Sequence, residues 1–93
     1  MTDAPDQLSI ERKRLRFRSW HRGTREMDLL LGRFADRRLD GLDQEALRVY
    51  AALLERNDPD IYDWVSGRFQ CPDGDLRRIV QALTEFHSTR SLS

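Results

Sequence analysis

Apolar residues recur along the chain at the spacing of α-helices. In five stretches they stand three and four positions apart, and short polar segments containing glycine, proline or aspartate separate these stretches. This spacing gathers apolar side chains on one face of a helix, whereas a half-buried strand would alternate apolar and polar residues. The pattern predicts an all-α fold with five helices, over about residues 9–21, 24–39, 43–56, 58–67 and 75–87.

Each predicted helix has a candidate inner face. The period is clearest in the second helix and the apolar stripe is thinnest in the first, where arginines occupy most of the surface. The residues expected to face the core are Ile10, Phe17 and Trp20 in the first helix, Met27, Leu30, Leu31 and Phe34 in the second, Ala46, Val49, Tyr50, Leu53 and Leu54 in the third, Ile61, Trp64, Val65 and Phe69 in the fourth, and Leu76, Ile79, Val80, Leu83 and Phe86 in the fifth.

Residues between the predicted helices carry signals of helix ends. Gly23 can adopt the positive φ with which many helices end. The candidate N-caps are Thr24, Asp43 and Asp58, the last followed by Pro59 at the first helical position. For the fifth helix, Asp73 or Asp75 can take this role. Because the connections are short, sequential helices should pack roughly antiparallel around one core, as a compact five-helix bundle.

The length of 93 residues suits one small domain. We expect this domain over residues 9–87, with flexible termini over 1–8 and 88–93. No run approaches the roughly 20 apolar residues of a membrane span, and the N-terminal residues lack the apolar region of a secretory signal. Cys71 is the sole cysteine and cannot form an internal disulfide, so a cytoplasmic location without membrane insertion is expected.

The formal net charge is zero, but the charges are segregated. Residues 11–25 carry seven basic residues and one acid, a net charge of +6, whereas residues 26–93 carry nine bases and thirteen acids, a net charge of −4. Arg14, Arg18 and Arg22 stand four apart and could form a row that binds phosphates. The acidic remainder opposes a nucleic-acid partner, and a solvated basic face or an acidic protein partner also explains the row.

The sequence has no recognisable catalytic or metal-binding constellation. It lacks a glycine-rich phosphate loop and a nucleophile elbow, and His21 and His87 lie far apart in the chain. Asp58, Asp60 and Asp63 lack the glycine and the distal glutamate of a calcium loop. We therefore expect neither catalysis nor a metal site.

The segment over residues 20–28 is the strongest candidate for a contact site. Gly23 accounts for a helix end, and Glu26 and Asp28 are favourable acids in the first turn of the next helix. Arg22 has no such explanation, because cations are disfavoured at the positive end of a helix. Arg22 could pair with Glu26 across this corner or reach outward to a partner.

The motifs of this region resemble a known family. Arg22-Gly23-x-x-Glu26 is followed by Met27-Asp28-Leu29-Leu30-Leu31 and Phe34, and then by Asp58-Pro59-Asp60-Ile61-Tyr62-Asp63-Trp64. Together these residues resemble the small FAD assembly factors of succinate dehydrogenase, over about residues 10–87. The chain differs in Thr24-Arg25, where relatives often have an apolar residue, and in His21, where a second arginine is common.

The resemblance implies a five-helix bundle that acts as an assembly factor and not as an enzyme. It implies a partner, the flavoprotein subunit of succinate dehydrogenase or of fumarate reductase, and covalent attachment of FAD to a histidine of that subunit. The chain itself would hold no FAD tightly and would be a monomer in the bacterial cytoplasm. The implied partner-binding residues are Arg22, Gly23 and Glu26, with Asp28, Asp58 and Asp60 as weaker candidates. A nucleic-acid-binding module and an antitoxin-like interaction module remain as alternatives.

Overall fold

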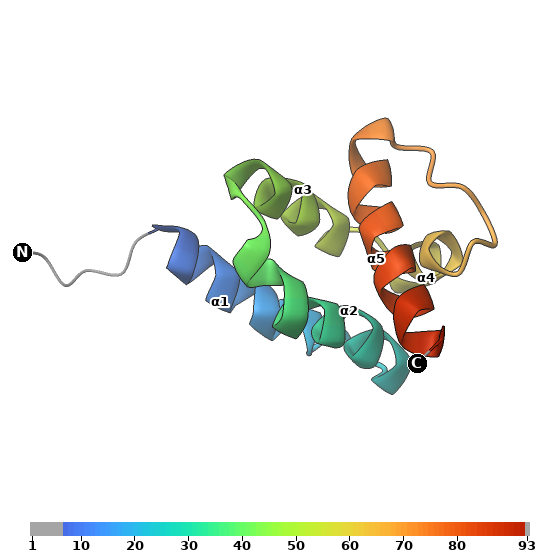
Figure 1. Cartoon of the computed structure of the whole chain (residues 1–93), viewed down its shortest axis with the longest axis horizontal. Helices are drawn as coiled ribbons and strands as arrows, with labels where there is room; N and C mark the ends of the chain where they lie inside the picture. Colours follow the sequence, from blue (N-terminus) through green and yellow to red (C-terminus); the bar gives the residue numbers. More distant parts are fainter. Residues whose placement is uncertain (1–6, 93) are drawn as a thin grey trace, which may run out of the picture.

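The computed structural model describes residues 7–92, with side chains described as far as Ser88. Over this range the chain forms five α-helices and one short 3-10 helix, without a strand, which confirms the predicted all-α fold (Figure 1). The elements are α1 (Gln7–Ser19), α2 (Arg25–Arg38), η1 (Leu39–Gly41), α3 (Gln44–Leu54), α4 (Asp58–Val65) and α5 (Gly74–Leu92).

The helices pack in two groups that share a core. Helix α1 packs against α2 and α3, and the first two run side by side in Figure 1. Helix α5 packs against α2, α3 and α4, so it joins the C-terminal half of the chain to the N-terminal pair. Within the described residues, no helix is long and apolar enough to cross a bilayer.

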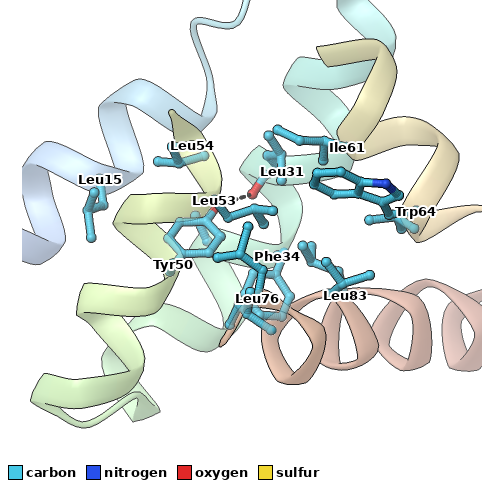
Figure 2. Close-up of a cluster of buried hydrophobic side chains, with 14 of the residues drawn as sticks. Leu15, Leu31, Phe34, Tyr50, Leu53, Leu54, Ile61, Trp64, Leu76 and Leu83 are labelled. Carbon is cyan, nitrogen blue, oxygen red and sulfur yellow. Dashed lines mark hydrogen bonds between the residues drawn. The ribbon is translucent and has the colours of Figure 1, made fainter. Parts of the chain in front are cut away.

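Aromatic residues from three helices pack together in the core, and Figure 2 labels two of them, Phe34 and Tyr50. The ring of Phe34 lies 5.6 Å from that of Tyr50 and 5.6 Å from that of Phe86, the latter edge to face. Such tilted and edge-on pairs are favourable beyond the area that they bury. All five residues predicted for the inner face of α5 are buried, as are Ile61, Trp64 and Val65 of α4.

Helix α1 buries a different face from the one predicted. Leu15 is fully buried, whereas Phe17 is 63% exposed and Ile10 is 37% exposed. The fully buried Ser19 faces the core because its hydroxyl shares a 2.6 Å hydrogen bond with Tyr50. A polar residue therefore holds a core position that an apolar pattern alone cannot reveal.

The helix ends confirm two predicted caps and correct a third. The side chains of Thr24 and Asp43 accept hydrogen bonds from the amides three residues on, at 3.3 and 2.8 Å. Helix α4 has Asn57 as its N-cap instead of Asp58, because the Asp58 carboxylate is occupied by an arginine from another part of the chain.

Two further boundaries and the inner face of one helix differ from the predictions. Helix α4 ends at Val65, and Phe69 lies beyond it, 59% exposed and outside the core. Helix α3 buries Leu47, which was not predicted, while Ala46 and Val49 are only half-buried. Helix α5 continues past the expected end at His87 to Leu92.

Candidate functional site at the motif corner

Arg22 lies directly after α1, and its side chain points into the molecule. Its Nε and Nη2 both donate to Oδ1 of Asp58, at 2.9 and 2.7 Å. Its Nη1 donates to the carbonyl of Leu54 at 2.8 Å, and Nη2 also lies 3.1 Å from that of Arg56. Neither suggested role of Arg22, a pair with Glu26 or an outward contact, is correct, because Asp58 and two carbonyls engage the guanidinium.

The position of Arg22 has a simple electrostatic cause. Helix α3 ends at Leu54, and the last carbonyls of a helix lack partners within it and carry partial negative charge. A guanidinium presents several donors in one plane, so it can satisfy such a carbonyl, that of Leu54, together with the Arg56 carbonyl beyond the helix and a carboxylate. Arg22 thus fastens the α1–α2 connection to the α3–α4 connection, 36 residues further along the chain.

Asp28 completes this internal arrangement. Its Oδ1 accepts a 2.7 Å hydrogen bond from the backbone amide of Arg22. The side chain of Arg22 is 11% exposed and that of Asp58 is 23% exposed, so the ion pair is largely shielded from water. We call residues 22–28 the motif corner; its frame is the hydrogen-bonded set of Arg22, Asp28 and Asp58.

Gly23 and Glu26 face outward from this frame. Gly23 has φ of +118°, a conformation that residues with a Cβ rarely adopt, and a Cβ built there would meet nothing within 4 Å. The backbone at this point is therefore open to a partner. Glu26 is exposed, and its carboxylate makes no hydrogen bond or ion pair with the described part of the chain.

A shallow groove lies beside the corner, between the start of α2 and α4. Its volume is about 430 Å³. Its lining residues are Thr24, Glu26, Met27, Asp58, Pro59, Tyr62 and Asp63. Tyr62 is half exposed, and Glu26, Asp58 and Asp63 are acidic residues of the lining. We call this the corner groove. It offers an apolar floor within an acidic surround, which are groups suited to recognising a protein surface.

The structure brings most of the predicted site residues together but not all. Glu26 and Asp58 line the corner groove, while Asp60 is exposed on α4 and is not among the lining residues. Sequence reasoning treated Met27 as core only, and it is buried at 4% exposure while also forming part of the groove. Tyr62 lies off the apolar stripe of α4, and that off-face position is the signal that could have marked it.

The predicted arginine row on α1 is not continuous. Arg14 is exposed, Arg18 pairs with Glu55 at 2.6 Å, and Arg22 lies beyond the end of the helix and faces Asp58. Within residues 7–92 no group of His, Cys, Asp or Glu side chains is arranged to hold a metal ion.

Fold and corner define a small helical accessory protein whose exposed groups suit binding. The sequence model of a family described as flavinator of succinate dehydrogenase matches residues 13–87, and the chain belongs to this family. The membership confirms the predicted function as an assembly factor in the flavinylation of succinate dehydrogenase and the accessory, non-enzymatic role.

Individual relatives agree with this membership. The FAD assembly factor SdhE of Acetobacter pasteurianus is 40% identical over 82 residues, which are 84% of this chain and 75% of that protein. The SdhE of Pseudomonas aeruginosa is 39% identical over 68 residues, 71% of this chain and 81% of the relative. The mitochondrial succinate dehydrogenase assembly factor 2 of Dictyostelium discoideum is 42% identical over 76 residues, 82% of this chain but 53% of the relative, so the match spans about half of that longer protein.

Proposed function

We propose that the chain binds the flavoprotein subunit of succinate dehydrogenase, or of fumarate reductase, through the motif corner and thereby promotes covalent attachment of FAD to a histidine of that subunit. The observation that carries this proposal is the outward position of Gly23 and Glu26 beside the corner groove. An open backbone next to an unpaired carboxylate and an exposed aromatic ring gives a partner both close approach and directional contacts.

The motif residues divide into two roles in this proposal. Arg22, Asp28 and Asp58 are positioning residues, because their polar atoms are used within the chain. Gly23 and Glu26 contact the client, and Asp60 adds a charge at the edge of the same surface. A client surface that fits this site is basic around an apolar projection.

The chemistry of flavin attachment belongs to the client in this proposal. The corner groove does not fit FAD as a ligand, since Glu26 and Asp63 would repel its pyrophosphate, and the groove has no glycine-rich turn at a helix N-terminus to receive one. The client supplies the reacting histidine and the charge stabilisation that the flavin needs. The chain holds the client in a competent arrangement.

Selective binding to one conformer explains how such a protein can act without a reacting group. A partner shifts a conformational equilibrium only by its difference in affinity for the two states. The chain should therefore bind the immature flavoprotein more tightly than the finished enzyme. We propose that it does so as a monomeric domain over residues 9–87 in the cytoplasm.

The test is co-expression of the flavoprotein subunit with variants of the full chain, followed by flavin fluorescence of the denatured subunit on a gel. Glu26→Gln should lower this signal several-fold while the free energy of unfolding changes little, since Glu26 has no partner within the described residues. Asp75→Asn is the matched control, because it removes one charge from the first turn of α5 instead. It should leave the signal unchanged.

Gly23→Arg separates contact from backbone strain. A side chain at φ of +118° costs roughly 1–3 kcal/mol but meets no neighbouring atom, so the fold should persist while client binding is lost. Gly67→Arg is matched, because Gly67 has φ of +84° and equally open space beyond the end of α4. Equal flavinylation by wild type, Gly23→Arg and Glu26→Gln contradicts the proposal.

A further inference from the structure

The side of α1 that faces away from the core exposes apolar residues. Phe17 and Ile10 are two of the large apolar side chains that the described residues leave exposed, and both lie opposite Leu15 on the helix. Positions three, four and seven apart share a helix face, so two basic residues and a histidine flank them. We call this set the outer face of α1: Ile10, Lys13, Arg14, Phe17 and His21.

The Phe17 ring packs on a neighbouring ring although it lies in solvent. It stacks on His21 with ring centroids 3.9 Å apart and planes inclined by 20°. The Nδ1 atom of His21 lies 2.7 Å from the Phe17 carbonyl oxygen, which fixes the imidazole over the phenyl ring. An aromatic side chain that is already ordered loses little conformational entropy when a partner buries it.

Two basic residues on the outer face of α1, Lys13 and Arg14, have no acidic partner among the described residues. Arg12 donates to the carbonyls of η1 and Leu42, Arg16 pairs with Asp40, and Arg18 pairs with Glu55. Lys13 and Arg14 are exposed and form no hydrogen bond or ion pair with the rest of residues 7–92. The positive charge that remains available is therefore next to Phe17, which suits an acidic partner surface.

The expected size of a client interface also requires more than the corner groove. A stable protein–protein interface takes roughly 20–30 residues from each partner, and seven residues line the groove. Helix α1 ends at Ser19, and His21, which stacks on Phe17, directly precedes Arg22, so the outer face of α1 adjoins the motif corner in the chain. Phe69, another exposed ring, lies after α4, away from the motif in the chain, and has the Arg68 guanidinium 5.7 Å from its centroid.

We propose that the outer face of α1 is a second part of the docking surface for the flavoprotein client, and that it meets an acidic client surface with an apolar recess for Phe17. This inference rests on the proposed function. The corner groove is acidic and the outer face of α1 is basic, so the two parts contact oppositely charged regions of the client. Opposite charges at two points fix the orientation of one protein on the other.

Titration of the full chain into the purified apo flavoprotein subunit, followed by calorimetry, tests this inference. Phe17→Ala should weaken binding about tenfold, the usual cost of an aromatic residue at the centre of an interface. Lys13→Glu combined with Arg14→Glu should weaken binding most at low salt and should flatten its salt dependence. Both changes are at exposed positions, so the melting temperature should stay within a few degrees of wild type.

Matched controls exist elsewhere on the surface. Phe69→Ala removes a ring of similar exposure. Arg33→Glu with Arg37→Glu reverses two charges at exposed positions of α2 that have no ion pair with the described residues. Both controls should keep the wild-type affinity.

The outcomes separate this inference from the proposed function. If Glu26→Gln weakens binding and the α1 variants do not, the outer face of α1 is not part of the docking surface, while the motif corner is. If wild type does not bind the apo flavoprotein, both proposals fail. Binding to vesicles that contain phosphatidylglycerol is measured in parallel. If the α1 variants keep their affinity for the flavoprotein and lose only their binding to these vesicles, a membrane occupies this face and the inference is overturned.

Discussion

Arg22 and Arg18 are a pair of residues whose similar chemistry should have unequal consequences. Both pair with an acid near the end of α3 or the start of α4, but the Arg22 side chain is 11% exposed and that of Arg18 is 35% exposed. Removing Arg22 leaves the Asp58 carboxylate and two carbonyls without donors in a shielded site. Removing Arg18 leaves Glu55 in water, where it needs no partner.

We therefore expect Arg22→Ala to destabilise the fold by about 2–4 kcal/mol and Arg18→Ala by less than about 1 kcal/mol. Urea unfolding followed by circular dichroism measures both values. Equal losses for the two variants would mean that the frame contributes nothing beyond a surface ion pair.

The burial of Tyr50 should make the protein less stable at high pH. Burial raises the pKa of Tyr50 to about 12 from the ordinary value of 10.0. Because the folded state holds the neutral phenol, its contribution is complete below pH of about 10 and is lost as the pH rises towards 12. Tyr50→Phe should cost about 1 kcal/mol near neutral pH, by loss of the hydrogen bond to Ser19, but should lose less stability between neutral and alkaline pH than wild type. Parallel alkaline slopes for the two proteins in urea titrations would contradict this.

For single residues, the sequence predicts local roles at helix ends better than it predicts contacts with distant residues. Thr24 and Asp43 obey local rules of helix ends, and each is the predicted N-cap. Gly23 has the predicted positive φ but does not end a helix, because α1 already ends at Ser19. The pair between Arg22 and Asp58 crosses 36 residues, and no local spacing predicts it. The same limit applies to Ser19, whose burial depends on a hydroxyl from α3.

Among the elements, α1 and α2 meet at a point of close approach. A Cβ built on Gly32 would lie 2.3 Å from Cδ2 of Trp20, so the indole ring fills the space that a side chain would occupy. The Trp20 Nε1 donates to Asp36 at 3.1 Å, which holds the ring in place over α2. The glycine therefore sets how near the two helices lie.

Gly32→Ala is expected to lower the free energy of unfolding even though alanine is the better helix former. The gain in helix propensity is about 1 kcal/mol, whereas displacement of a packed ring costs about 1–3 kcal/mol. Trp20 fluorescence should also shift, because the ring must leave its site. Gly41→Ala is the control, since its Cβ meets nothing within 4 Å. A gain in stability for Gly32→Ala would show that the ring moves at no cost.

Over the described residues the chain has the predicted five α-helices, and the bounds of α1 to α4 are close to those predicted, because caps and apolar periods are local signals. Helix α5 is longer than predicted, since it continues to Leu92. The face of α1 is the clear error. Its apolar stripe, Ile10 and Phe17, points outward, while Leu15 and a serine face the core. A stripe marks a surface that is to be buried, and it does not say whether the chain itself or another protein buries it.

On the scale of the whole molecule, charge segregation is used internally. The basic first helix lies against the acidic remainder, with Arg12, Arg16 and Arg18 bonded to groups between Leu39 and Glu55. The sequence shows the segregation but not this pairing, since composition carries no geometry.

The family and the fold class were predictable because the motifs span most of the chain. The contact surfaces that we propose depend on which charges stay unpaired within the described residues, and only the structure shows those.

The frame around Arg22 also bears on whether an isolated peptide with the motif sequence can reproduce the conformation of the motif corner. Its contacts come from two connections that are distant in the chain, and the backbone at Gly23 is held in place by both. A linear peptide copied from residues 20–30 would lack Asp58 and the carbonyls of α3, so its backbone would sample many conformations and present no fixed surface. An inhibitor or mimic of this corner must therefore copy a discontinuous epitope, with α3 and α4 as its scaffold.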